Sequence, residues 1–339
     1  MPDKPGSSRS PRGWYGFERY PGTVPAVLPA VLEANSAGEA RVPEHSWRDA
    51  ARRHAERAAA LTAGHRARRL RGERHPVEDF LWTYYSVKPN ELARWHPGAG
   101  VFLEGAAEER GAWRHYRPSG RDAAVDLPTF FSRRGGTVDY VEQLLTATLA
   151  HPPRFGCFGL HEWAMVYRLT PEQIRHSQLE LRIGHEATDR VVESNPISCT
   201  HFDAYRFFTP DAAPLNALRP TRDTQPELEQ SACLHAGMDV YKWAAKLGPI
   251  VPGEVLLDAF VLARDIREVD MRASPYDVRA FRGASGDPLT PIPIETPDGK
   301  REYSALQRGF ARRGDELRHR VLAAIGVARA ALAAAAEAR

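Results

Sequence analysis

Acidic and basic side chains recur at helical spacing in the C-terminal third of the chain. Asp239 and Lys242 lie three residues apart beside an apolar stripe, and Lys246 follows one turn later. Such a pair is either an exposed ion pair worth about 0.3–0.5 kcal/mol or the rim of a pocket. At a pocket rim, a partly buried lysine with a lowered pKa can act as a base or nucleophile. Asp239 and Lys242 are therefore candidate catalytic residues.

Asp265 is a third candidate catalytic residue. It lies next to Ile266, which belongs to the apolar face of a predicted helix, so we expect its carboxylate at the boundary of burial. There it could orient a water molecule or stabilise a cation. The alternative is a structural salt-bridge network formed by Arg264, Asp265, Arg267, Asp270 and Arg272.

A His-x-Asp motif lies in the middle of the chain, where apolar and polar residues alternate. This alternation predicts an antiparallel ribbon over 178–208, with His201 and Asp203 on the same side of a strand. The two residues supply two thirds of the 2-His-1-carboxylate set that binds non-haem iron. The alternative is a polar face packed against helices, with its histidines paired to carboxylates. Residues that could complete the metal site are His161, Glu162 and His235.

Aromatic residues are dense around these candidates. We expect most of them in the core, while a subset could hold a flat ligand such as a nucleobase, since stacking contributes about 1–3 kcal/mol per base. The candidates for substrate binding are Trp163, Tyr205, Tyr241, Trp243 and Tyr276.

The periodicity of the chain predicts a mostly α fold with a small central antiparallel β ribbon, an α+β class. The predicted helices cover residues 43–71, 138–149, 160–167, 227–247, 253–271 and 303 to the end, with short strands within 98–134. Residues 1–22, rich in Pro, Ser and Arg, predict a disordered tail. The remainder, 23–339, is expected to form one large domain or two parts, 23–210 and 211–339.

Composition limits the classes of function. The chain has 339 residues, 42% of them hydrophobic, and a net charge of +3. This near balance excludes an obligate polycation, so a nucleic-acid contact would need a local patch. One candidate patch is Arg48–Arg74, which carries nine arginines against three acidic residues. Three widely spaced cysteines, no signal peptide and no apolar run of about 20 residues predict a cytoplasmic protein without a membrane partner.

Several segments resemble a set of actinobacterial proteins that are commonly described as 3-methyladenine DNA glycosylases. The resemblance covers roughly residues 74–325 and includes Gly159-Leu-His-Glu-Trp, Thr200-His-Phe-Asp-Ala-Tyr and Met238-Asp-Val-Tyr-Lys-Trp. The segment from Tyr241 to Tyr276 is also similar to the C-terminal part of queuosine nucleotide N-glycosylases. These resemblances imply a helical, glycosylase-like C-terminal part.

The resemblance implies an N-glycosylase that releases a modified, alkylated nucleobase from DNA or a nucleotide without a cofactor. Its transition state resembles an oxocarbenium ion, which a carboxylate stabilises. Asp265 or Asp239 would be that carboxylate, and Lys242 a substrate contact. A second hypothesis is an iron or zinc enzyme that uses His201 and Asp203. A third is a non-catalytic nucleic-acid-binding module that uses Arg48–Arg74.

Overall fold

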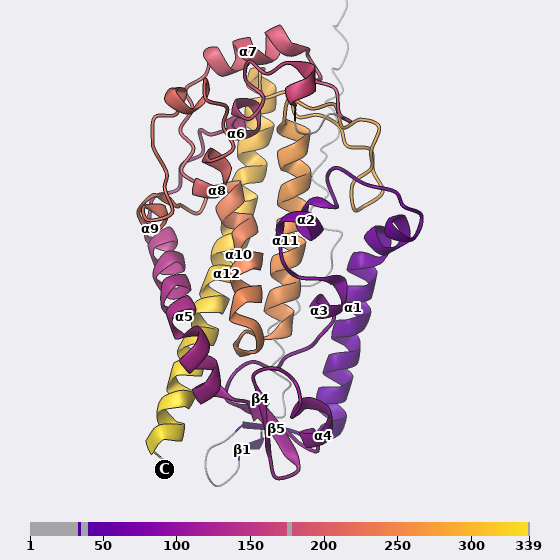
Figure 1. Ribbon diagram of the computed structural model, residues 1–339, viewed down its shortest axis with the longest axis vertical. Helices are drawn as coiled ribbons and strands as arrows, with labels where there is room; N and C mark the ends of the chain where they lie inside the picture. Colours follow the sequence, from indigo (N-terminus) through magenta and orange to yellow (C-terminus); the bar gives the residue numbers. More distant parts are fainter. Residues whose placement is uncertain (1–32, 35–39, 175–177, 338–339) are drawn as a thin grey trace, which may run out of the picture.

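The computed structural model describes residues 33–34, 40–174 and 178–337. Its architecture is mostly helical with one small sheet, as the sequence predicts. Long helices run side by side along the longest axis, the sheet lies at one end, and short helices and loops gather at the other (Figure 1). The predicted tail, residues 1–22, lies outside the described residues.

Five long helices form the frame of the molecule: α1 (Glu44–Leu70), α5 (Leu127–Ala150), α10 (Leu234–Leu247), α11 (Gly253–Ala273) and α12 (Pro297–Glu337). Local signals set their ends. Asp126 accepts a hydrogen bond from the backbone N–H of Thr129 and so caps the first turn of α5. Pro43 precedes α1, and Gly72, with φ +70°, follows it.

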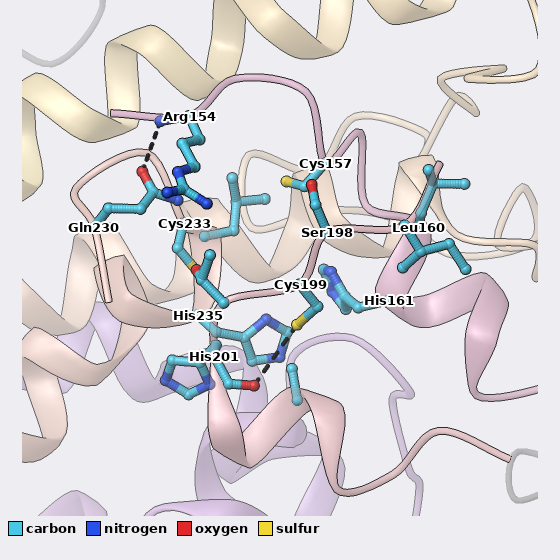
Figure 2. Close-up of a pocket in the computed structure, with 14 residues that line it drawn as sticks. Arg154, Cys157, Leu160, His161, Ser198, Cys199, His201, Gln230, Cys233 and His235 are labelled. Atoms are coloured by element: carbon cyan, nitrogen blue, oxygen red, sulfur yellow. Dashed lines mark hydrogen bonds between the residues drawn. The ribbon is translucent and has the colours of Figure 1, made fainter. Parts of the chain in front are cut away.

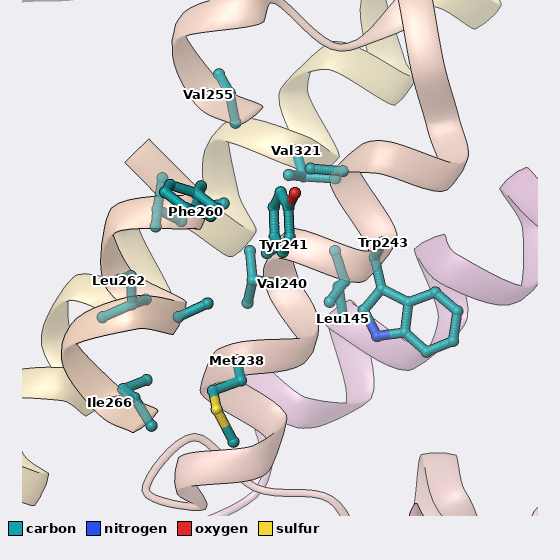
Figure 3. Close-up of a cluster of buried hydrophobic side chains, with 14 of the residues drawn as sticks. Leu145, Met238, Val240, Tyr241, Trp243, Val255, Phe260, Leu262, Ile266 and Val321 are labelled. Atoms are coloured by element: carbon teal, nitrogen blue, oxygen red, sulfur yellow. The ribbon is translucent and has the colours of Figure 1, made fainter. Parts of the chain in front are cut away.

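The helices α10 and α11 form a closely packed pair that organises the core. They are joined by the 3₁₀ turn Gly248–Ile250, whose first residue has a positive φ of 53° that favours glycine. Gly237 of α10 permits the close approach, because a Cβ there would lie 2.7 Å from Ile266 Cδ1. Figure 3 shows the apolar side chains of this pair meeting Leu145 of α5 and Val321 of α12.

The sheet has the strand order β1-β2-β3-β5-β4. Its strands are β1 (Glu33–Ala34), β2 (Ala40–Val42), β3 (Val101–Leu103), β4 (Tyr116–Ser119) and β5 (Asp122–Val125). β2 and β3 are parallel, and the other neighbours are antiparallel. The two-residue turn between β4 and β5 begins with Gly120 at φ +61°, which suits a tight hairpin. The short strands expected within 98–134 are therefore confirmed.

The ribbon predicted over 178–208 is wrong. That stretch holds α7 (His185–Glu193), α8 (Phe202–Tyr205) and irregular chain, with only the isolated bridges of Leu181 to Tyr276 and Ile197 to Asn216. The Asn216 side chain accepts a hydrogen bond from the Cys199 N–H and donates one to the Cys199 carbonyl. The Asn216 side chain thus takes the place of a neighbouring strand at Cys199. The sheet of the protein is formed by β1–β5 and lies at one end of the molecule rather than at its centre (Figure 1).

The helix predicted over 227–247 is interrupted. The chain forms α9 (Gln225–Leu228), then an irregular segment, and resumes as α10 at Leu234. Glu229 and Gln230 in that segment are buried. The other short helices are α2 (Phe80–Tyr84), α3 (Pro89–Leu92), α4 (Ala107–Arg110) and α6 (Leu160–Ala164).

The terminal helix α12 contains an 18-residue stretch with a mean hydropathy of 1.3, which by length and composition alone could cross a membrane. Buried core helices of soluble proteins meet the same criterion, whereas 22% of this stretch is buried. Arg329 near the end of α12 forms ion pairs with Asp139 and Glu142 of α5.

Candidate metal centre

A small cavity lies among α6, the loop before α8, and the start of α10. It offers about 20 Å³ to the centre of a water-sized sphere, which is room for one or two water-sized molecules. Three histidines line it: His161, His201 and His235 (Figure 2). The centroid of the His235 ring is 4.5 Å from that of His161 and 5.4 Å from that of His201. The ring of His235 therefore adjoins both of the others.

A first group of metal-binding side chains consists of His161, His235 and Asp270, which come from α6, α10 and α11. One potential ligand atom from each lies within 4.8 Å of the others. His161 Nε2 is 3.1 Å from Asp270 Oδ1, and Asp270 is fully buried. Neither atom makes a hydrogen bond within the described part of the chain.

A second group consists of His201, Glu229 and Asp239, which also lie within 4.8 Å of one another. His201 Nε2 is 3.2 Å from Glu229 Oε1 and 3.5 Å from Asp239 Oδ2. His201 is 1% exposed, and neither of its ring nitrogens has a hydrogen-bond partner among the described residues. Two adjacent groups thus hold buried imidazole and carboxylate atoms that face one another at ion-pair distances.

The separations within both groups suit ligands that share an ion. Ligand atoms at about 2.0–2.2 Å from a metal lie roughly 3–3.5 Å apart when they occupy neighbouring coordination positions. The three contacts of 3.1, 3.2 and 3.5 Å fall in this range. A buried polar atom without a partner is costly, and an ion between these atoms would satisfy them together.

Two cations hold the carboxylates in place. Arg267, 2% exposed, donates hydrogen bonds to Glu162 at 2.8 Å and to Asp270 at 3.2 Å. Lys242 donates to Asp239 at 2.7 Å and to Asp203 at 3.0 Å. Arg267 contacts Asp270 through Oδ2 and leaves Oδ1 without a hydrogen bond among the described residues, whereas Lys242 contacts the Asp239 oxygen that also faces His201.

The electrostatics of the three histidines differ. Burial and the neighbouring His161 and His201 lower the pKa of His235 well below its usual value, so its ring is neutral, the form that binds metals. Burial also opposes the charged form of His201, but Glu229 and Asp239 outweigh it and raise the pKa of His201 to about 10.

Lys242 does not have the lowered pKa that a base or nucleophile requires. Burial lowers its pKa, yet Asp239 and Asp203 outweigh burial and raise it. Burial likewise acts to raise the pKa of Asp239, but Lys242 and His201 lower it well below the usual range. Asp239 and Lys242 are therefore an ion pair with both partners charged, partly shielded from water.

The three cysteines, widely spaced in the sequence, all line the cavity. Burial raises the pKa of each thiol, to about 12 for Cys199. In the metal-free chain the thiols are therefore protonated. The ligand atoms of the two groups are nitrogen and oxygen.

The structure separates the predicted site residues into two sets. His161, His235, His201 and Asp239 belong to the two groups, and Glu162 adjoins the first through Arg267. Asp203 does not join them: it forms ion pairs with Lys242, Arg206 and Arg222 on α8 and its surroundings. The strand predicted to set His201 and Asp203 on one side is wrong, and Asp203 belongs to neither group of potential ligands among the described residues.

Asp265 and the predicted substrate-binding aromatics lie away from the cavity. Asp265 forms an ion pair with Arg313 at 2.8 Å, and its side chain is 32% exposed. None of the five aromatic residues lines the cavity: Trp163, Tyr205, Tyr241, Trp243 and Tyr276. Trp163, for example, is fully buried and donates its indole N–H to the Ala273 carbonyl.

Two ligand candidates and one positioning residue were not predicted from the sequence. Asp270 and Arg267 were expected in a structural salt-bridge network, and they do form an ion pair, but both are buried beside His161. Glu229 was expected inside a helix that the structure interrupts. The usable signal was the run Arg267-Glu-Val-Asp270, which sets an arginine and an aspartate three residues apart between apolar residues of one helix.

The basic segment Arg48–Arg74 corresponds mainly to α1. Five of its nine arginines form ion pairs with carboxylates of this chain, namely Arg48, Arg52, Arg57, Arg68 and Arg71. These guanidinium groups are already paired, so the segment offers fewer cations for phosphate contacts than its composition indicates.

Comparison of the chain with protein-family models, curated proteins and solved structures finds no match.

Proposed function

We propose that the protein is a metal-dependent enzyme of the non-haem iron type, with His161, His235 and Asp270 as the ligands. The observation that carries the proposal is the pair of buried atoms His161 Nε2 and Asp270 Oδ1, which lie 3.1 Å apart without a hydrogen bond. Two imidazoles and one carboxylate are the set typical of non-haem iron(II) enzymes, and zinc accepts the same donors.

A catalytic role is favoured over a structural one by the number of ligands and by the cavity. Structural zinc sites use four protein ligands, whereas catalytic sites keep at least one position open for water or substrate. The first group provides three, and the cavity beside His161 and His235 has room for a water-sized molecule. Such an ion would supply Lewis-acid or redox chemistry to a small molecule bound there.

The residues around the ligands have positioning roles in this proposal. Arg267 fixes Asp270 through Oδ2, which leaves Oδ1 directed at His161. Arg267 also holds Glu162, a second buried carboxylate next to the ligand His161. Hydrogen bonds of this kind orient ligands and tune the metal.

Nitric oxide binding to the iron-loaded protein tests the proposal. The metal-free chain is loaded with iron(II) under argon and exposed to nitric oxide, which binds iron at an open position and gives the EPR signal of a ferrous nitrosyl complex. We expect this signal in the wild type and its loss in His161→Ala. The control is His319→Ala, because His319 is exposed on α12. A wild type that binds no iron, or a signal unchanged in His161→Ala, contradicts the proposal.

Hydrolysis of an N-glycosidic bond, which the family resemblance implies, is a second candidate function. One observation favours it: Asp239 is buried and held ionised by Lys242, as suits a carboxylate that stabilises a developing positive charge. Release of free base from alkylated DNA and from modified nucleotides, measured in the presence of EDTA, tests it. Activity that survives EDTA and is lost in Asp239→Asn supports a metal-independent glycosylase, and no release from either substrate contradicts it.

A further inference from the structure

The second group, His201, Glu229 and Asp239, has the features of a metal site in its own right. Its three side chains come from separate places in the chain: the residue before α8, the loop after α9, and the middle of α10. All three are buried, at 1%, 2% and 4% exposure. Segments distant in sequence thus bring one imidazole and two carboxylates together inside the protein.

The imidazole of His201 is the independent sign of a ligand. Both of its nitrogens are buried and lack a hydrogen bond within the described residues, although two carboxylates lie 3.2 and 3.5 Å from Nε2. The Nε2 atom lies within ion-pair distance of two carboxylates rather than against a single acceptor.

Hydrogen bonds from neighbouring residues fix the orientation of both carboxylates. Asp239 accepts from the Tyr85 hydroxyl through Oδ1 at 3.2 Å, and its Oδ2, which faces His201, accepts from Lys242 at 2.7 Å. Gln225 donates its amide to Glu229 Oε1, the oxygen that also faces His201. Such outer partners are typical of residues that hold metal ligands in position.

The charge of the region favours more than one cation. Four carboxylates are buried around the two groups, and the cations that contact them in the metal-free chain are Arg267, Lys242 and the His201 ring. Glu229 and Asp239 outweigh burial and keep that ring protonated by raising its pKa to about 10. Lys242 is shared with Asp203. Buried charges require compensation, and a divalent ion in each group would provide it. The four carboxylates are Glu162, Glu229, Asp239 and Asp270.

We infer that His201, Glu229 and Asp239 bind a second metal ion beside the first, so that the centre is dinuclear. The inference rests on the proposed function for the first ion. The ring of His235, which belongs to the first group, adjoins both His161 and His201, so the imidazoles of the two groups are neighbours (Figure 2). A set of one imidazole and two carboxylates suits iron, manganese or zinc. Lys242 and Tyr85 are positioning residues for Asp239.

Metal stoichiometry distinguishes the second ion from the first. The full chain is stripped of metal and titrated with manganese(II), and the free ion is measured by EPR. We expect about two equivalents bound by the wild type and by His319→Ala, and about one by His161→Ala and by His201→Ala. Glu229→Gln, which keeps the side-chain size, is expected to lose one equivalent as well. Circular dichroism identifies any variant that does not fold.

Three results would overturn the inference in different ways. One equivalent that is lost in His161→Ala but kept in His201→Ala leaves the first site and removes the second. One equivalent lost in either variant means a single shared ion, which also excludes a dinuclear centre. No bound manganese, iron or zinc in the folded wild type contradicts the second site together with the proposed function.

Discussion

Histidines pack at both ends of α11, and their surroundings differ. At its start, near the sheet, His96 forms a 3.0 Å hydrogen bond with the Tyr116 hydroxyl, and its carbonyl accepts from the Gly253 N–H. His54 bonds through Nε2 to the Leu92 carbonyl at 2.9 Å. Burial, reinforced by Arg110, lowers the pKa of His96 to about 3. These rings are neutral and bond to neutral groups.

At the other end of α11, His161 and His201 face carboxylates at 3.1–3.5 Å without hydrogen bonds. Burial opposes their charged forms, yet the carboxylates raise the pKa of both. The comparison teaches that burying an imidazole in this fold needs only a neutral partner. Carboxylates are therefore not required for packing. Opposite His161 and His201 they stabilise a positive charge, which is a ring proton in the metal-free chain and the metal ion in the proposed centre.

Replacing Arg267 is expected to have the largest effect on stability. In metal-free protein, Arg267→Met leaves Glu162 and Asp270 buried without their cation, and breaking such a pair costs about 3–5 kcal/mol. Urea unfolding measures it, with Arg313→Met as the control, since Arg313 pairs with the partly exposed Asp265. Zinc added to Arg267→Met should recover part of the loss. If Arg267→Met and Arg313→Met lowered the unfolding free energy equally, the buried ion pairs of Arg267 would not differ in strength from the partly exposed pair of Arg313.

Metal removal should lower the stability of the protein through the two groups at one end of α11. Free ion at about 100 times its Kd stabilises a folded protein by about 2.7 kcal/mol, and EDTA should abolish this gain. Thermal unfolding with and without EDTA measures the difference. The same response is expected in His319→Ala, and a smaller one in His161→Ala. A response that is identical in both variants would show that the ion binds elsewhere.

The stability of the protein should fall in acid because of His96, at the start of α11. His96 has a folded pKa of about 3, below the value of about 6.5 for an unfolded histidine. Between these values the unfolded chain takes up a proton that the folded chain excludes, so stability is complete above pH 6.5 and falls below it. A single such group contributes about 1.4 kcal/mol per pH unit. Urea unfolding of wild type and His96→Gln from pH 7 to 5 should show a shallower decrease in the variant, and parallel curves would contradict it.

The smallest effect is expected at Asp265. Its ion pair with Arg313 is one-third exposed, and surface pairs contribute about 0–1 kcal/mol. Asp265→Asn should therefore change the unfolding free energy by less than about 1 kcal/mol and leave metal binding unchanged. Loss of metal binding or of base release in this variant would show that Asp265 is a functional residue.

The sequence predicted those elements that local signals determine. The helix over 43–71 was found as Glu44–Leu70 because Pro43 and Gly72 mark its ends, and Gly248 likewise marks the end of α10. Alternation misled at 197–208, because the Asn216 side chain takes the hydrogen bonds that a neighbouring strand would take.

The candidate site was predicted in part. His161, His201, His235 and Asp239 stood out by residue type, and all four lie in the two groups. Glu229 and Asp270 could not be found in the same way, because their burial depends on how α9, α10 and α11 pack together. The periodicity of a sequence indicates which face of one helix is buried. A set of metal ligands is formed by side chains from several helices and loops, which periodicity does not predict.

Anomalous diffraction tests the central claim most directly. Crystals of the wild-type chain reconstituted with zinc or iron are measured on both sides of the absorption edge of that metal. The account predicts an anomalous peak between His161 Nε2, Asp270 and His235, and a second between His201 Nε2, Glu229 and Asp239. Peaks only beside exposed side chains such as His319, with none in the buried groups, would contradict it.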